Sequence, residues 1–392
     1  MPLFLPTLLA LALVGHFAFW FAVINRLHAT ALPYRFLKLC DAAWYVIVLG
    51  LPAALGWSWW QAVRAAVPWP GPGQIWPLAT YLGLCGPATL VVTARWGWRT
   101  FVERTTPLLI ANHTQRVNIR ERLGRQPAAT LLTRLLATIP GNQIFDLHIH
   151  DKQLRLPRLP SALSGITIAH LSDLHLTGQL APEFFQEVVR LTNQLDADLI
   201  AITGDIVDKA RCLDWIPDTL GPLRARQGVY FVLGNHDTRV PDPRRLRRAL
   251  AAAGMIDLGG HCRRIEVRGL PVILAGNELP WFGPAADLGD CPGDVPADPR
   301  PLRIVLSHSP DQIDWARAHD VDLLLCGHTH GGQIRLPLIG PLVSPSRFGV
   351  DFAGGTFHRP PTLMHVSRGV SGTRQFRWNC PPELTRLTLV SD

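Results

Sequence analysis

The sequence lacks paired cysteines and is poor in lysine. Its seven cysteines are scattered, their number is odd, and none belongs to a Cys-x-x-Cys motif. This pattern argues against a disulfide framework and favours a reducing compartment. Lys38, Lys152 and Lys209 are the only lysines, so the net charge of +8 comes almost entirely from arginine. A basic chain of this kind suits a nucleic acid, a membrane surface or an anionic substrate as partner.

Charged residues are also scarce before Arg95. Three stretches of this region carry no charge, at 3–24, 42–60 and 75–94. A membrane-spanning helix needs about 20 apolar residues, and a buried hairpin in a soluble protein would need a large core to cover three such runs. The first run lacks the basic start of a signal peptide. We therefore expect a transmembrane region over residues 1–98.

The loops between these stretches predict an orientation. Basic residues follow the first and the third stretch: Arg26, Arg35, Lys38, Arg95, Arg99 and Arg104. The loop between the second and third contains only Arg64. Because basic loops tend to stay in the cytoplasm, we expect the N-terminus outside the cytoplasmic (inner) membrane and the C-terminal part in the cytoplasm.

Residues 99–143 are predicted as a basic linker next to the membrane. Four arginines, at 116, 120, 122 and 125, precede an apolar helix expected at 128–139. Such a segment suits an anionic membrane interface. It would equally suit a linker helix that packs on the following domain, and the sequence leaves both interpretations open.

From residue 144 onward, short apolar runs alternate with helical patterns. The expected strands are 145–150, 166–171, 198–203, 228–233, 302–306 and 321–325, and the expected helices are 182–195 and 243–253. Buried strands that alternate with helices predict a layered α/β domain over 144–392. In such domains the polar residues just after the strands converge on one crevice.

Short polar clusters follow these strands. They are Asp173-Leu-His175, Gly204-Asp205, Gly234-Asn235-His236-Asp237, Ser307-His308 and Gly327-His328-Thr-His330. Each alone would pass for a turn, and the signal is their joint occurrence in this order. Two aspartates, an asparagine and several histidines are the ligand set of a two-metal phosphoester-cleaving centre, in which one carboxylate, here Asp205, bridges the ions. By contrast, His148 and His150 are two residues apart on the solvent-facing side of a strand, and we expect them to be solvated.

These clusters and their flanks resemble the calcineurin-like metallophosphoesterase superfamily. The flanks are Leu171-Ser-Asp-Leu-His175, Gly327-His-Thr-His-Gly-Gly-Gln333 and Val366-Ser-Arg-Gly369. They are similar to a branch of membrane-anchored phosphodiesterases that includes the chlamydial-type UDP-2,3-diacylglucosamine pyrophosphatase. The resemblance implies a layered β-sandwich flanked by helices. The run 276–282, which contains Asn277, Glu278 and Trp281, departs from the expected pattern.

The resemblance also implies the roles of individual residues. The first metal would be held by Asp173, His175, Asp205 and His330, and the second by Asp205, Asn235, His308 and His328. His236 would contact the phosphate and protonate the leaving oxygen, and Asp237 would orient His236. Two divalent ions are expected, with manganese as the first choice, while iron, zinc and cobalt suit the same ligands.

The resulting hypothesis is a membrane-anchored hydrolase of a phosphodiester or pyrophosphate. Its partners would be membrane lipids and an anionic substrate, lipid-linked in the manner of UDP-2,3-diacylglucosamine. A tethered nucleotide or nucleic-acid phosphodiesterase is the alternative, although the basic helix at 244–248 lacks the aromatic residues that nucleic-acid binding favours. An inactive membrane scaffold is a second alternative, which the intact ligand set disfavours. No oligomeric state is predicted.

Overall fold

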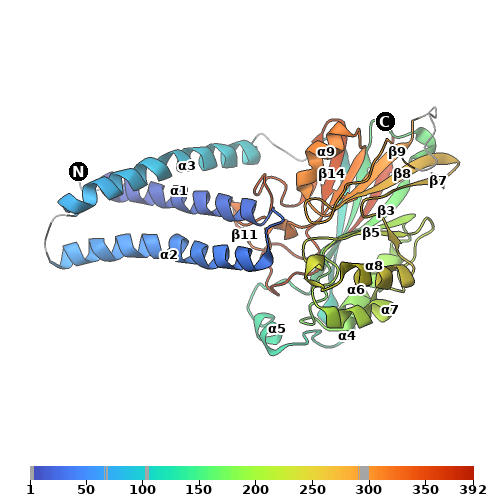
Figure 1. Ribbon diagram of the computed structural model, residues 1–392, viewed down its shortest axis with the longest axis horizontal. Coiled ribbons are helices and arrows are strands. Elements are labelled where there is room, and N and C mark those ends of the chain that lie inside the picture. The colour runs from blue at the N-terminus through green and yellow to red at the C-terminus, as the bar shows by residue number, and fades with distance from the viewer. Residues whose placement is uncertain (1–3, 66, 68, 102–105, 290, 292–299) are drawn as a thin grey trace. The chain divides into compact units, whose positions relative to one another are not determined.

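The computed structural model describes residues 4–65, 67, 69–101, 106–289, 291 and 300–392. The chain divides into two compact units, Met1–Arg104 and Thr105–Asp392 (Figure 1).

The first unit contains the helices α1 (Phe4–Leu27), α2 (Tyr34–Arg64) and α3 (Ile75–Phe101). Three segments, Thr7–Leu27, Tyr34–Arg64 and Pro72–Arg99, are long and apolar enough to cross a membrane. Gly15 lies where α1 and α3 meet, and a Cβ there would be 1.9 Å from the carbonyl oxygen of Cys85. Small residues of this kind let membrane helices approach closely.

The second unit contains two large sheets. The first has the strand order β1-β2-β15-β3-β4-β5-β6. In this order the strands are Leu109–Asn118, Asp146–Arg155, Glu383–Val390, Ile166–Leu171, Leu199–Thr203, Val229–Val232 and Ile256–Asp257. The second sheet has the order β13-β14-β10-β9-β8-β7. Its strands are Gly355–Arg359, Thr362–Val366, Leu323–Cys326, Leu302–Ser307, Leu270–Asn277 and Cys262–Val267. A separate hairpin pairs β11 (Arg335–Leu336) with β12 (Gly340–Pro341).

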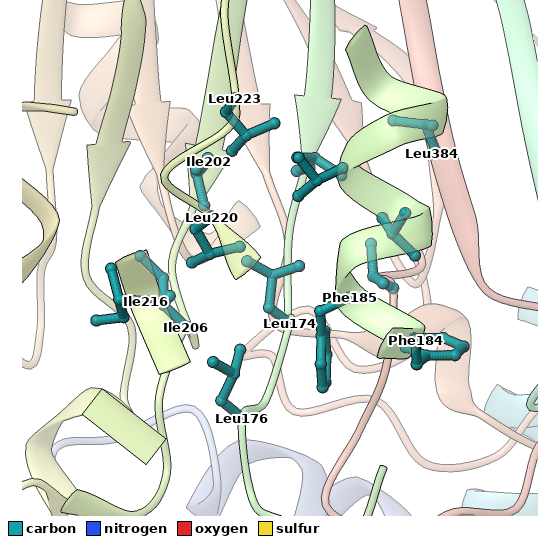
Figure 2. Close-up of a cluster of buried hydrophobic side chains, with 14 of the residues drawn as sticks. Leu174, Leu176, Phe184, Phe185, Ile202, Ile206, Ile216, Leu220, Leu223 and Leu384 are labelled. Atoms are coloured by element: carbon teal, nitrogen blue, oxygen red, sulfur yellow. The ribbon is translucent and has the colours of Figure 1, made fainter. Parts of the chain in front are cut away.

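The two sheets pack face to face around an apolar core that includes Ile168 and Leu199 of the first sheet and Ile304 of the second. Helices α6 (Pro182–Gln194), α7 (Ile216–Thr219) and α8 (Pro243–Ala252) supply a second core on the first sheet. Figure 2 shows Phe184 and Phe185 of α6 in this core. Helix α9 (Ile313–Ala318) belongs to a third core with the second sheet. The predicted layered α/β sandwich flanked by helices is confirmed.

The structure differs from the expected linker over 99–143. Residues 109–118 form β1, which pairs antiparallel with β2 inside the first sheet. The short helix α4 (Ile119–Leu123) follows, and its Arg122 contacts Glu187 of α6 at 2.5 Å. The helix expected at 128–139 is only α5 (Leu131–Leu136). It begins after Thr130, whose side chain accepts a hydrogen bond from the backbone N–H of Thr133 as an N-cap.

Candidate metal centre

The polar clusters gather because the strands before them run parallel. β3, β4 and β5 are parallel neighbours in the first sheet, as are β9 and β10 in the second. Five residues of the clusters adopt left-handed backbone, with φ between 48° and 70°: Asp173, His175, Asp205, His328 and His330. Non-glycine residues rarely adopt this conformation, and such strain is concentrated at functional sites.

One group consists of Asp173, His175, Asp205 and His330, whose nearest ligand atoms lie within 4.8 Å of one another. His175 Nε2 lies 3.2 Å from His330 Nε2 and 3.5 Å from Asp205 Oδ2. His330 Nε2 lies 3.5 Å from Asp173 Oδ1. The two aspartates and His175 are buried. Mixed carboxylate and imidazole atoms at this spacing can hold a divalent cation.

A second group consists of Asp205, His308 and His328, again within 4.8 Å. His308 Nε2 lies 3.3 Å from Asp205 Oδ1 and 3.1 Å from both Asn235 Oδ1 and His328 Nδ1. Asp205 therefore directs Oδ2 toward His175 of the first group and Oδ1 toward the second group. This is the arrangement that a bridging carboxylate requires.

The protons on His308 indicate that the second group suits a cation. Its Nδ1 lies 2.7 Å from the carbonyl oxygen of Thr203, which can only accept, so Nδ1 carries a proton. Burial would lower the pKa of His308, but the Asp205 carboxylate raises it to about 9. A second proton on His308 Nε2 is therefore held tightly near Asp205 Oδ1 and Asn235 Oδ1. A divalent cation can replace this proton and bind the same two oxygens.

The surroundings of Asp205 also show whether these residues fit bound cations. Its Oδ2 atom is buried and accepts no hydrogen bond from the described part of the chain. Burial alone would raise the pKa of Asp205, but the neighbouring His308 and His236 hold it well below its ordinary value, so the carboxylate is charged. A buried charged oxygen without a hydrogen bond is costly unless a cation lies beside it. The residues present therefore fit a pair of divalent cations.

Glycines in the clusters make room for these side chains. A Cβ on Gly327 would lie 1.7 Å from Ser172 Oγ and 2.4 Å from Asp173 Oδ2. A Cβ on Gly234 would lie 2.4 Å from Asp205 Oδ1. Any larger residue would displace a candidate ligand, which explains why glycine begins these motifs.

Asp208, which no sequence motif singled out, connects the first group to His236. Its Oδ1 lies 2.6 Å from His175 Nδ1 and its Oδ2 lies 2.6 Å from His236 Nδ1. A carboxylate only accepts, so both Nδ1 atoms carry protons and both Nε2 atoms are left to face the centre. Burial opposes this charge, but His175 and His236 lower the pKa of Asp208 below its ordinary value. Arg239 adds a cation, with one guanidinium nitrogen 2.9 Å from Asp208 and the other 3.0 Å from His236 Nε2.

The contacts of Asp237 do not match its predicted role. Its side chain does not orient His236 and instead accepts hydrogen bonds from backbone N–H groups. Oδ1 accepts from Ile206 and Val207 at 2.9 Å, and Oδ2 accepts from Gly234 at 2.8 Å. Asp237 therefore joins the loop after β4 to the loop after β5.

His150 lies outside both groups, and it is buried, whereas a solvated side chain was expected. Its Nδ1 lies 2.9 Å from Thr114 Oγ1, and its Nε2 lies 2.6 Å from a guanidinium nitrogen of Arg368. The unusual run 276–282 lies near the second group, because the Trp281 ring is 4.8 Å from the His328 ring. Buried Glu278 holds this run by accepting from the backbone N–H of Leu233 at 2.5 Å.

Comparisons with known proteins agree with this geometry. Residues 166–332 match the model of the calcineurin-like phosphoesterase family. The chain is 31% identical to the phosphodiesterase YaeI of Escherichia coli, over 57% of this chain and 82% of that protein. It is 27% identical to the UDP-2,3-diacylglucosamine pyrophosphatase LpxG of Chlamydia muridarum, over 64% of this chain and 94% of that protein. It is also 27% identical to a transmembrane protein with metallophosphoesterase domain of Danio rerio, over 56% of this chain and 54% of that protein.

The resemblance inferred from the motifs is thus confirmed, and the three apolar helices agree with a membrane protein. The chain belongs to the calcineurin-like phosphoesterase family and is a metal-dependent phosphoester hydrolase with a binuclear metal centre.

Proposed function

We propose that two metal sites share Asp205. The first would use Asp173, His175, Asp205 and His330, and the second would use Asp205, Asn235, His308 and His328. The observation that carries this proposal is that the two oxygens of Asp205 face two different groups. Two bound divalent cations would neutralise an anionic phosphoryl group and lower the pKa of a shared water. Manganese is the proposed metal, and iron, zinc or cobalt would suit the same donors.

His236 is the proposed catalytic residue. Burial lowers the pKa of His236, so the ring is neutral near pH 7 and its Nδ1 proton is held by Asp208. Nε2 lies 4.0 Å from Asp205 Oδ2, at the edge of the proposed centre. Nε2, which accepts from Arg239, would first take up a proton from solvent, and the lowered pKa would then favour transfer of that proton to the leaving oxygen. Arg239 is well placed to attract the anionic substrate.

Metal removal tests this assignment. Chelation of the purified full chain should abolish hydrolysis of an aryl phosphodiester, and Mn²⁺ should restore it. Asp205→Asn should remove the charge that both ions share and lower the bound metal measured by elemental analysis. The matched control is Asp196→Asn, because Asp196 is exposed and lies outside both groups. Full activity in the metal-free protein would contradict the proposal.

The proposed substrate is a lipid-linked phosphodiester or pyrophosphate of the UDP-2,3-diacylglucosamine type. Support comes from the printed function of the chlamydial relative and from three candidate membrane spans, since one span would suffice to hold an enzyme of soluble substrates at the membrane.

A comparison of acylated and deacylated forms of one headgroup tests the lipid requirement. In mixed micelles, kcat/KM should be higher for the acylated form. Equal values would remove the lipid claim and leave a general phosphodiesterase at the membrane.

We further propose that the chain resides in the cytoplasmic (inner) membrane, with the catalytic unit facing the cytoplasm. The support is the distribution of basic residues between the loops described above.

A further inference from the structure

Helix α5 buries a polar side chain and exposes its leucines. Its Thr133 is fully buried, whereas Leu131, Leu132 and Leu135 are 72%, 63% and 58% exposed. Ile139, just after the helix, is also exposed. A helix at the surface of a soluble domain normally turns its leucines inward. The folding of this unit therefore does not explain the outward leucines.

The β11–β12 hairpin also exposes apolar side chains. Leu338 at its tip is 92% exposed and adopts left-handed backbone with φ of 65°. Turns at such positions usually use glycine, asparagine or aspartate. Ile334, Ile339 and Val343 on or beside the hairpin are exposed as well.

One segment joins these two features. Asn142 Nδ2, just beyond α5, donates to the carbonyl oxygens of Leu136 and Gln375. Three residues later, Trp378 accepts from the backbone N–H of Arg335 at 2.9 Å, at the base of the hairpin. Figure 1 draws α5 and β11 toward the same end of this unit, away from β7. The exposed leucines and isoleucines thus border one stretch of surface, called the apolar face below.

The segments that carry the apolar face contain basic residues and no acid. Residues 127–145, 331–350 and 371–380 include no aspartate or glutamate, and Arg134, Arg335 and Arg374 on them are exposed or half-buried. Of their other arginines, Arg347 is paired with Asp314 and Arg377 is buried. An apolar surface with basic residues and no acid suits a bilayer with anionic headgroups. A protein partner of ordinary composition would not require this combination.

A short connection joins the last candidate membrane span to the second unit. The last candidate span ends at Arg99 and β1 begins at Leu109. Ten residues reach at most about 35 Å even when fully extended, whereas a folded unit of this size is roughly 50 Å across. A connection of this length allows the unit to rest on a bilayer that the candidate spans would cross.

We propose that α5 and the β11–β12 hairpin form a membrane-docking face that inserts its leucines and isoleucines into the bilayer interface. This surface goes beyond the proposed hydrolysis and does not depend on the identity of the substrate. It also borders the candidate centre, since His330 lies four residues before Ile334 and its carbonyl oxygen accepts from Cys380 Sγ at 3.3 Å. Docking would place the centre close to the headgroups.

The test measures the depth of the apolar face in a bilayer. The full chain is placed in nanodiscs of phosphatidylethanolamine and phosphatidylglycerol, with Cys40→Ser and Cys262→Ser because the other five cysteines are buried. A fluorescent label is attached through Leu132→Cys or Leu338→Cys. The matched control is Glu266→Cys, an exposed position on β7. Lipids with a nitroxide on the acyl chain should remove most of the emission at positions 132 and 338 and leave position 266 unchanged.

Two results would overturn the proposal. Equal quenching at all three positions would show that the face has no special depth. A blue-shifted emission without quenching at positions 132 and 338 would show that protein covers the face, such as the helices of the first unit. Failure of the proposed hydrolysis would leave the quenching result intact, because fluorescence does not require turnover.

Discussion

At the scale of single residues, Asp208 is the most informative position, because its two oxygens contact the imidazoles of His175 and His236. An amide in its place has one acceptor oxygen, so Asp208→Asn cannot hold both Nδ1 protons. We expect the metal affinity to fall about 10–100-fold, as for other groups that orient a metal ligand. A titration of the metal-free variant with Mn²⁺, read by calorimetry, measures this loss.

The paired variant His236→Ala separates metal binding from chemistry. His236 is not a proposed ligand, so both metals should remain bound. Loss of a general acid typically lowers kcat by about 10²–10⁴-fold, and less for an activated aryl leaving group. Unchanged metal affinity in Asp208→Asn, or metal loss in His236→Ala, would contradict the roles assigned here.

The gathering of the candidate ligands could be predicted because each follows a buried strand within a short motif. The partner of His236 could not, because sequence proximity favoured Asp237, the next residue, over Asp208, which is 28 positions away. Asp208 approaches His236 because the loops after β4 and β5 are neighbours in the first sheet. A signal was available in the spacing, since Asp208 follows Asp205 by three residues on one loop.

At the scale of elements, β2, β14 and β15 bring together a buried charged cluster that the sequence did not indicate. Lys152 Nζ lies 2.9 Å from His365 Nε2 and 3.0 Å from Glu383 Oε1. Burial, and then the Lys152 ammonium, lower the pKa of His365 to about 4. Burial opposes the charge on Glu383, but Lys152 and Arg368 hold its pKa well below the ordinary value.

Both shifts predict that acid destabilises the fold. The His365 side chain is neutral in the folded protein and takes up a proton near pH 6.5 in the unfolded chain. Its contribution to the free energy of unfolding is therefore complete above pH 6.5 and is lost as the pH falls toward 4. The depressed pKa of Glu383 acts in the same direction at lower pH. A shift of this size for His365 corresponds to about 3 kcal/mol.

The measurement is the melting temperature of the full chain in detergent with chelator, between pH 7.5 and 4.5. His365→Gln should reduce the dependence on pH, while His319→Gln, at an exposed position, should retain it. Equal slopes in both variants would exclude His365 as the source of the acid sensitivity.

Prediction of the elements was best where signals were local. The expected strand 166–171 agrees with β3 at both ends, and the expected helices 182–195 and 243–253 each extend one residue beyond α6 and α8. β1 and β15 were not predicted, because their places in the sheet depend on pairing with distant residues. β15 lies between β2 and β3 although it is the last strand of the chain.

At the scale of the whole molecule, the uneven distribution of basic residues predicts the topology. Arg64 is the one basic residue between the uncharged stretches 42–60 and 75–94, whereas several basic residues follow the stretches 3–24 and 75–94. Moving basic loops across the membrane is disfavoured, so an odd number of spans would leave the N-terminus outside and the catalytic unit in the cytoplasm.

A pair of reporters fused after Asp392 tests this topology. A fluorescent protein that matures only in the cytoplasm should be bright, and an alkaline phosphatase that requires export should be inactive. The same fusions placed after Gly71, in the loop between α2 and α3, should give the opposite result and serve as the control. An active phosphatase after Asp392 would reverse the orientation. It would also place the five cysteines of the second unit in an oxidising compartment, where the absence of paired spacing among them would need another explanation.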